Sequence, residues 1–274
     1  MLNLTRPDHT PLPSPALPLV VAQARHAGVR GEVTADVVAA VQDRLRQVTG
    51  VDLERVAQLM STDIIIGPGV SPPPQTSTPG VQLATADGTW QATVTREWVS
   101  LETQRFTSYD GAFRPLFEQL LLVVTELLSP VTTVRCGLRF VNVLTPPADA
   151  RGGAPDAWGR WVRSSLVALA ADEWLAAGIE TFAGQMLLSV APGVHSGVRS
   201  GPVQNDGTPA FLLDIDTYAE PQSVWRASEV LAQFDRLNES GVALFQELIT
   251  PEMLNHLRGE ESEVSSQSEG GSRS

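Results

Sequence analysis

Hydrophobic and polar positions alternate along several stretches of the chain, with the period of two that half-buried β-strands have. The clearest case is residues 89–95, where Trp90, Ala92 and Val94 are separated by glutamine and threonine. The preceding Asp87-Gly88 dipeptide is favoured in two-residue hairpin turns. The alternation predicts strands at Pro18–Ala27, Thr62–Gly67, Val81–Ala86, Thr89–Thr95, Val99–Thr107, Thr133–Leu144, Phe182–Ala191, Val194–Gln204 and Ala210–Tyr218.

Other stretches repeat apolar residues at spacings of three and four, which predicts amphipathic helices. Thr34 is the expected N-cap of the first, Pro115 lies in the first turn of the second, and Asp156 is the expected cap of the third. The stripes expected to be buried are Val38, Val41, Leu45 and Val48; Phe113, Leu116, Phe117, Leu120, Val124 and Leu127; and Trp158, Trp161, Val162, Ser165, Leu166 and Leu169.

Two more helices are predicted near the end of the chain. A long one covers residues 223–248, with an interruption near Gly241. A short one begins at Thr250-Pro251-Glu252, which combines an N-cap, a proline at the first helical position and an acidic first turn.

Proline, glycine and serine divide the chain into segments. We expect a flexible segment at 1–16, a first half at 17–145, a linker at 146–155, a second half at 156–258 and a disordered acidic tail at 259–274. The order of elements predicts an α+β fold with one or two antiparallel sheets and amphipathic helices packed on one face. Two similar halves fit this order, but no sequence repeat supports a duplication.

Composition narrows the classes of function. All 19 basic residues are arginine, which excludes mechanisms that need a lysine amine. A GC-rich genome explains the missing lysine, and selection against lysine modification is the alternative. The net charge of −12 argues against direct nucleic-acid binding. With no membrane-length apolar run and no signal peptide, the chain is expected to be cytoplasmic.

Cysteine and histidine offer little support for a metal or a catalytic centre. Cys136 is the only cysteine of the 274 residues, and alternation places it at a core position. The four histidines lack the spacing of a zinc site, and no glycine-rich phosphate loop is present. We therefore expect no cofactor and no metal.

The strand predicted at 133–144 carries the main candidate chemistry. Arg135 and Arg139 point to one face with Gly137 between them, where glycine leaves room for a ligand. Two guanidinium groups on one face suit an anion or carboxylate. The competing interpretation is that they pair with carboxylates on a neighbouring strand, for which Asp214 and Asp216 are the candidates.

Asp214 and Asp216 also alternate onto one strand face, followed by Tyr218. Metal binding or acid–base catalysis by this pair has no support from a nearby histidine. Trp98, next to Arg96-Glu97 near a strand bend, is a candidate for a partly exposed interface anchor.

One region resembles a known family. The run Arg135-Cys-Gly-Leu-Arg-Phe-Val-Asn142 is similar to the R-x-G-L-R-[FY]-[IV]-N motif of a sporadically distributed bacterial family of uncharacterised proteins. The segments beginning Leu17-Pro-Leu-Val-Val and Leu237-Asn-Glu resemble that family's ends. The resemblance implies no known activity, and its patchy distribution suits phage-defence or toxin–antitoxin settings.

The first functional expectation is a non-catalytic subunit that binds a protein partner, in the manner of an antitoxin, an immunity protein or a defence accessory protein. The alternative is a small-molecule or anion-binding sensor or enzyme that uses the arginine–aspartate face. A homo-oligomer is a third possibility. The residues that would bind a ligand or partner are Arg135, Arg139, Asn142, Asp214, Asp216 and Trp98.

Overall fold

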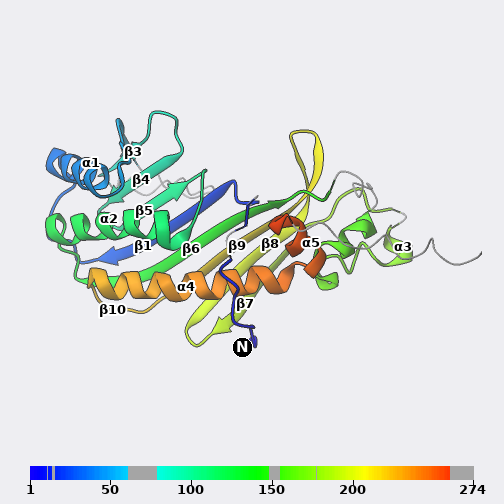
Figure 1. Ribbon diagram of the computed structural model, residues 1–274. Helices are drawn as coiled ribbons and strands as arrows, with labels where there is room; N and C mark the ends of the chain where they lie inside the picture. The colour runs from blue at the N-terminus through cyan, green and yellow to red at the C-terminus, as the bar shows by residue number, and fades with distance from the viewer. Residues whose placement is uncertain (11, 14–15, 61–78, 148–154, 177, 260–274) are drawn as a thin grey trace, which may run out of the picture.

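The computed structural model describes residues 1–10, 12–13, 16–60, 79–147, 155–176 and 178–259. Within these residues a single antiparallel sheet of ten strands runs through both halves of the chain (Figure 1). The strand order is β2-β3-β4-β5-β1-β6-β9-β8-β7, and β10 also pairs with β6. Strands β1 and β6 lie side by side at the centre and join the two halves.

The strands agree closely with the alternation of the sequence, and the α+β class with antiparallel pairing is confirmed. The predicted strand at Thr62–Gly67 lies outside the described residues. Strand β2, which the alternation did not indicate, was missed. The bounds are β1 Leu19–Ala27, β2 Arg55–Met60, β3 Pro79–Ala84, β4 Trp90–Thr95, β5 Trp98–Thr103, β6 Thr132–Leu144, β7 Gly184–Ala191, β8 Val194–Asn205, β9 Thr208–Ala219 and β10 Ser223–Val224.

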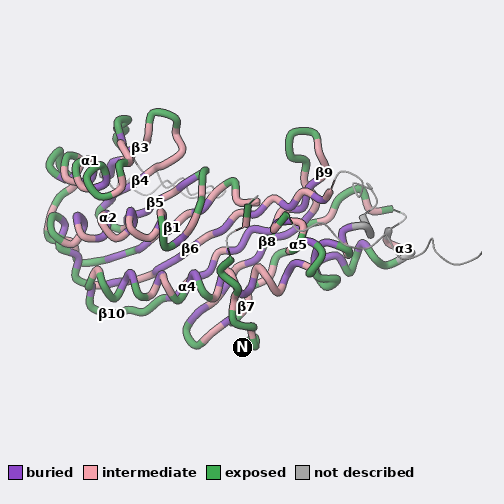
Figure 2. The backbone as a smooth tube through the Cα atoms, viewed as in Figure 1, coloured by how far each residue is buried: buried purple, intermediate pink, exposed green. Residues whose placement is uncertain are grey.

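Helices α1 (Ala35–Thr49), α2 (Arg114–Leu127) and α4 (Ala227–Leu248) lie on one side of the sheet (Figure 1). Helix α4 packs against β6 and β9, and α2 packs against β5. Buried residues run along the strands and along the helix sides that face them (Figure 2). We call the sheet face that contacts α2 and α4 the inner face and the opposite one the outer face.

Two predicted helix starts are confirmed. Pro115 lies in the first turn of α2, where its missing N–H leaves no helical bond unmade. Thr250 caps α5 (Pro251–Arg258), because its side chain accepts a hydrogen bond from the backbone N–H of Met253. The prediction of which α1 residues are buried is partly wrong, although Val41 and Leu45 are buried as expected. Val37 is buried in α1, whereas Val48 is 54% exposed.

Two helix predictions for the second half are corrected. Residues 156–169 form 3₁₀ turns at Pro155–Arg160 and Ser164–Leu166, because Val162 pairs with Ile249 in an isolated β-bridge that interrupts a helix. The only α-helix described nearby is the short α3 (Glu173–Ala176). Helix α4 continues through Gly241, where a Cβ atom would lie 3.3 Å from the ring of Phe140. Glycine therefore permits close helix–sheet contact there and does not break the helix.

The predicted hairpin forms between β3 and β4. Gly88 adopts φ 73°, which glycine tolerates, but the connection covers residues 85–89 and is longer than two residues. The next predicted strand, Val99–Thr107, ends at Thr103. Residues 104–108 then leave the sheet and lead into a π-helical turn at Tyr109–Phe113. This departure from the sheet builds one wall of the pocket described below.

Candidate functional site

The arginine and aspartate side chains predicted to share a face meet on the outer face of the sheet. Arg139 donates two hydrogen bonds to Asp214, from Nε to Oδ1 and from Nη2 to Oδ2, both of 2.7 Å. Arg135 donates from Nη2 to Oδ2 of Asp216 at 2.9 Å. Both pairs run diagonally between β6 and β9, because Arg139 faces Asp216 in the strand register. The predicted cross-strand pairing is confirmed.

Gly137 makes room for a side chain of the protein itself. A Cβ atom at this position would lie 2.7 Å from Nη1 of Arg135. The guanidinium carbon of Arg135 in turn lies 4.5 Å from the ring centre of Tyr218, in a cation–π arrangement. The space that the sequence assigned to a ligand is therefore occupied by Arg135.

The charges on this face neutralise one another. Asp214 is 6% exposed, and its two hydrogen bonds raise the pKa of Arg139. Burial raises the pKa of the nearby Glu102 carboxyl, and the Arg139 charge opposes that rise. Both guanidinium groups already hold a carboxylate, so an incoming anion would have to displace one.

The other two predicted residues lie apart from this cluster. Trp98 is half-buried at the start of β5, opposite Arg25 of β1 in the strand register. Asn142 is buried and alternates with Arg139 and Val141, so it points to the inner face. Sequence reasoning grouped six residues, and the structure brings together the two arginines and the two aspartates.

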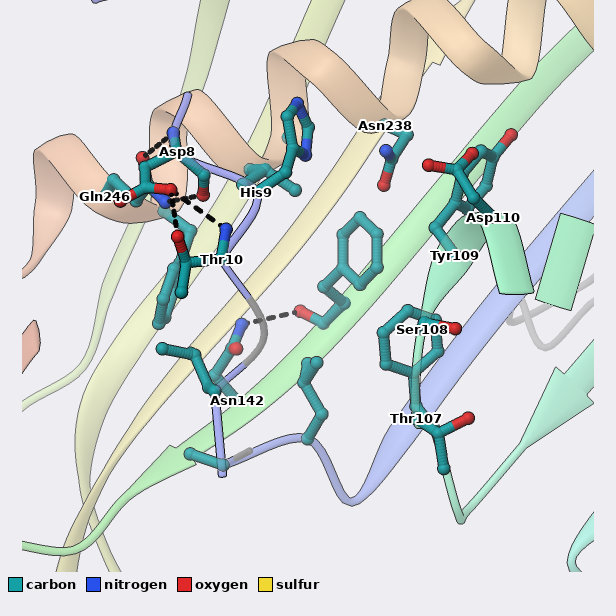
Figure 3. Close-up of a pocket in the computed structure, with 18 residues that line it drawn as sticks. Asp8, His9, Thr10, Thr107, Ser108, Tyr109, Asp110, Asn142, Asn238 and Gln246 are labelled. Carbon is teal, nitrogen blue, oxygen red and sulfur yellow. Dashed lines mark hydrogen bonds between the residues drawn. The ribbon is translucent and has the colours of Figure 1, made fainter. Parts of the chain in front are cut away.

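A pocket of about 330 Å³ lies on the inner face, beneath α4 (Figure 3). Four segments far apart in the sequence enclose it: the residues before β1, the residues after β5, the end of β6, and α4. The lining residues are Asp8, His9, Thr10, Leu12, Ala16, Leu17, Phe106, Thr107, Ser108, Tyr109, Asp110, Phe140, Asn142, Asn238, Gly241, Val242, Phe245 and Gln246.

Two carboxamide side chains point into this pocket (Figure 3). Asn142 donates from Nδ2 to the backbone oxygens of Leu213 at 2.9 Å and Phe140 at 3.3 Å. Carbonyl oxygens only accept, so these contacts fix which end of the amide is nitrogen. Asn238 of α4 is 6% exposed, and its side chain makes no hydrogen bond to any described residue.

A third polar group at the pocket is already engaged. The Tyr109 hydroxyl donates to Oδ1 of Asp235 at 3.1 Å, and Arg114 donates to both oxygens of the same carboxylate. Burial raises the pKa of Tyr109 above its ordinary value, so the phenol stays protonated. This cluster fixes the turn at 109–113 against α4.

The segment before β1 crosses α4 and closes one side of the pocket (Figure 1). We call residues 5–10 the strap. The backbone of Asp8 exchanges two hydrogen bonds with the Gln246 amide, of 3.0 and 2.7 Å. The Asp8 carboxylate also pairs with Arg258, and His9 lies 2.8 Å from Glu239. The strap is thus held at several points along α4 and α5.

Sequence reasoning missed the pocket, although one signal was present. Asn238 interrupts the apolar stripe of α4, between Leu237 and Gly241, at a position that is buried. A polar residue at a buried helix position indicates an internal partner or a binding site. The tyrosine, phenylalanine and strap residues carry no comparable signal, because loops bring them to the site.

Other candidate chemistry is weak in the part of the chain that the structure describes. Burial raises the pKa of the Cys136 thiol to about 12, which leaves it unreactive. Among the described residues, histidine, cysteine, aspartate and glutamate form no group of three that could hold a metal. No described helix combines the length and apolarity that a membrane crossing requires.

Comparison with known proteins finds no family model, no curated protein and no solved structure that matches this chain. The resemblance carried by residues 135–142 therefore remains a prediction, and the function is argued from the site alone.

Proposed function

We propose that this chain is a small-molecule-binding protein whose site is the pocket beneath α4. The observation that supports this most strongly is the buried Asn238 side chain, which points into the pocket without a partner among the described residues. Because this amide faces the pocket and bonds to no described residue, a ligand can hydrogen-bond to it without breaking an existing contact in the protein.

The size and lining of the pocket agree with this function. Its volume of about 330 Å³ falls within the range of roughly 300–1,000 Å³ that small-molecule sites occupy. Aromatic rings and a few buried polar groups form the walls, as in typical ligand sites. The site lies where the two halves of the sheet meet, so the rigid β6 strand supports its floor.

Fluorescence titration with 1-aminoanthracene tests the proposal. This uncharged aromatic amine becomes brighter in apolar surroundings, so we expect saturable enhancement with the full chain. The Val242→Phe variant places a larger side chain in the pocket and should weaken binding by roughly tenfold or more. Ala232→Phe is the matched control, because Ala232 is exposed on the same helix.

Equal enhancement in the Val242→Phe variant would mean that the dye binds elsewhere. Absence of saturable binding by the unmodified chain would contradict the proposed function directly. Circular dichroism of both variants confirms that the helix content is preserved.

The homo-oligomer predicted from the sequence as a third possibility is a second candidate, and the edge strand β7 favours it. Its eight residues, GQMLLSVA, carry no charge, and Leu187 is 67% exposed. Free edges are usually blunted by charges or proline, because they can pair with another strand. Among the described residues one outside backbone bond reaches this edge, from the N–H of Leu2 to the oxygen of Ser189 at 2.9 Å.

We propose a second copy of the chain as the occupant of this edge. Two copies of β7 placed antiparallel are self-complementary, as a two-fold symmetric interface requires. Each copy carries a net charge of −12, so contact through an uncharged strand avoids the repulsion that other surfaces would produce.

Light scattering coupled to size-exclusion chromatography measures the mass in solution. We expect a dimer for the unmodified chain and a monomer for Leu187→Lys. Leu169→Lys, at a site that is 65% exposed outside the sheet, should remain a dimer. A monomeric unmodified chain at about 100 μM would contradict pairing through β7 and leave the pocket proposal unaffected.

A further inference from the structure

The polar groups of the pocket define which chemistry a ligand must offer. Asn142 uses Nδ2 for two backbone oxygens, so the atom left for a ligand is the acceptor Oδ1. Asn238 keeps both its N–H donors and its oxygen acceptor, because no described residue bonds to them. A fitting ligand therefore has a donor for Asn142 and a donor or acceptor for Asn238.

The charges at the pocket argue against an anion. The lining contains two carboxylates, Asp8 and Asp110, and no arginine. Arg258 and Arg114 approach from outside the lining, but each is paired, with Asp8 and Asp235 respectively. His9, the remaining lining residue that can carry a positive charge, pairs with Glu239. A carboxylate or phosphate would lose its hydration without gaining a cationic partner.

The remaining walls suit a ring. Phe106 and Phe140 stand edge to face, with ring centres 6.1 Å apart, and both line the pocket. Phe245 and Val242 extend this apolar surface along α4. Flat apolar groups gain most from such walls, because aromatic contacts depend on orientation as well as on area.

We propose that the pocket binds an uncharged ligand of the aromatic carboxamide class, with a ring packed against the phenylalanine side chains and an amide bonded to Asn142 and Asn238. The amide N–H donates to Oδ1 of Asn142, and the amide oxygen accepts from Nδ2 of Asn238. This inference rests on the proposed function, and it adds the ligand class to it.

Displacement of 1-aminoanthracene by three ligands of one shape tests this class. The probes are 2-naphthamide, 2-naphthoate and 2-methylnaphthalene, which differ in the group attached to one ring system. We expect 2-naphthamide to displace the dye at roughly tenfold lower concentration than either of the others, since one buried hydrogen bond contributes about 1 kcal/mol or more.

The Asn238→Leu variant tests whether the preference for 2-naphthamide comes from Asn238. It should lose most of the preference for 2-naphthamide over 2-methylnaphthalene, because leucine fills the same space without the Asn238 amide and leaves the ligand only its bond to Asn142. Asn255→Leu, an exposed position on α5, is the matched control and should keep the preference for 2-naphthamide. Should Asn238→Leu fail to fold, the order of the three ligands on the unmodified chain decides alone.

The outcomes separate the two proposals. If the dye binds and 2-naphthoate displaces it as well as 2-naphthamide does, the ligand class is wrong and the binding function stands. If 2-methylnaphthalene is equal to 2-naphthamide, the two asparagines take no part and the class is again wrong. If the dye does not bind the unmodified chain, the proposed function itself is wrong.

Discussion

On the outer face of the sheet Arg135 and Arg139 each hold a carboxylate, whereas on the inner face several uncharged polar groups have no described partner. The Asn238 amide, which lines the pocket, makes no hydrogen bond to a described residue. Both ring nitrogens of His26 and the Thr133 hydroxyl are also buried on the inner face without a hydrogen bond. The charged side chains of the outer face are thus paired, although the buried Ser100 hydroxyl on that face has no hydrogen-bond partner among the described residues.

This difference tells us where a ligand has most to offer. A group that already has a partner gains little from a new contact, while an unpaired buried group gains a full hydrogen bond. Arginine and aspartate are candidate binding residues in the sequence because charged side chains on one strand face are easy to recognise there. In this chain the less conspicuous asparagines present the open hydrogen-bonding capacity.

Acidification is expected to act most strongly through the inner face. Burial against Trp225, whose ring centre lies 5.4 Å away, lowers the pKa of His26 to about 4. Between this value and the unfolded value near 6.5 the unfolded chain binds more protons, so stability falls as the pH falls through that window. We expect His26 to account for a loss of about 2.5 kcal/mol between about pH 7.5 and pH 4.5.

Urea unfolding across this range measures the loss. His26→Phe serves as the comparison, because it keeps an aromatic ring beside Trp225 and has no proton to bind. The carboxylates titrate in both proteins, so the difference between the two curves isolates His26. Parallel curves would show that His26 finds a partner when it becomes charged.

On the outer face, loss of one carboxylate should have a moderate effect. Asp214→Ala removes both hydrogen bonds to Arg139, whose side chain is 41% exposed, so water compensates in part. We expect the free energy of unfolding to fall by about 2 kcal/mol. The more exposed Asp216→Ala should cost less than about 1 kcal/mol, because its 39% exposed side chain makes one bond to Arg135.

Chemical denaturation of the two variants at neutral pH gives both values. Equal losses would mean that burial of Asp214 adds nothing to its pair. A gain in 2-naphthoate binding by Asp214→Ala would show that the freed Arg139 can hold an anion, and would revive the sensor role predicted for this face.

The sheet and its charged cluster could be predicted, because alternation within one strand fixes which side chains share a face. Arg135 and Arg139 belong together for this reason, and so do Asp214 and Asp216. The two pairs meet because β6 lies beside β9. Alternation within a strand does not specify which strands are neighbours. The prediction of a helix at 156–169 was wrong because of a contact between distant parts of the chain. The β-bridge from Val162 to Ile249 interrupts a segment whose apolar spacing is that of a helix.

The pocket could not be predicted in the same way. Its walls come from the strap, the residues after β5, β6 and α4, and no local pattern relates Asp8 to Phe106 or Asn238. Periodicity describes neighbours within one element, whereas this site depends on packing between elements and on where a strand ends. Thr103 ends β5 four residues earlier than alternation predicts, and the released chain supplies Phe106.

The contact between Asp8 and Arg258 joins residues 250 positions apart. During synthesis Asp8 leaves the ribosome long before the segment that holds it, because chains emerge from the N-terminal end at about 5–20 residues per second. The strap therefore has no place to dock until α4 and α5 have emerged and folded. The pocket is completed among the last events of folding, and a ligand can be enclosed only by a chain whose two distant segments have met.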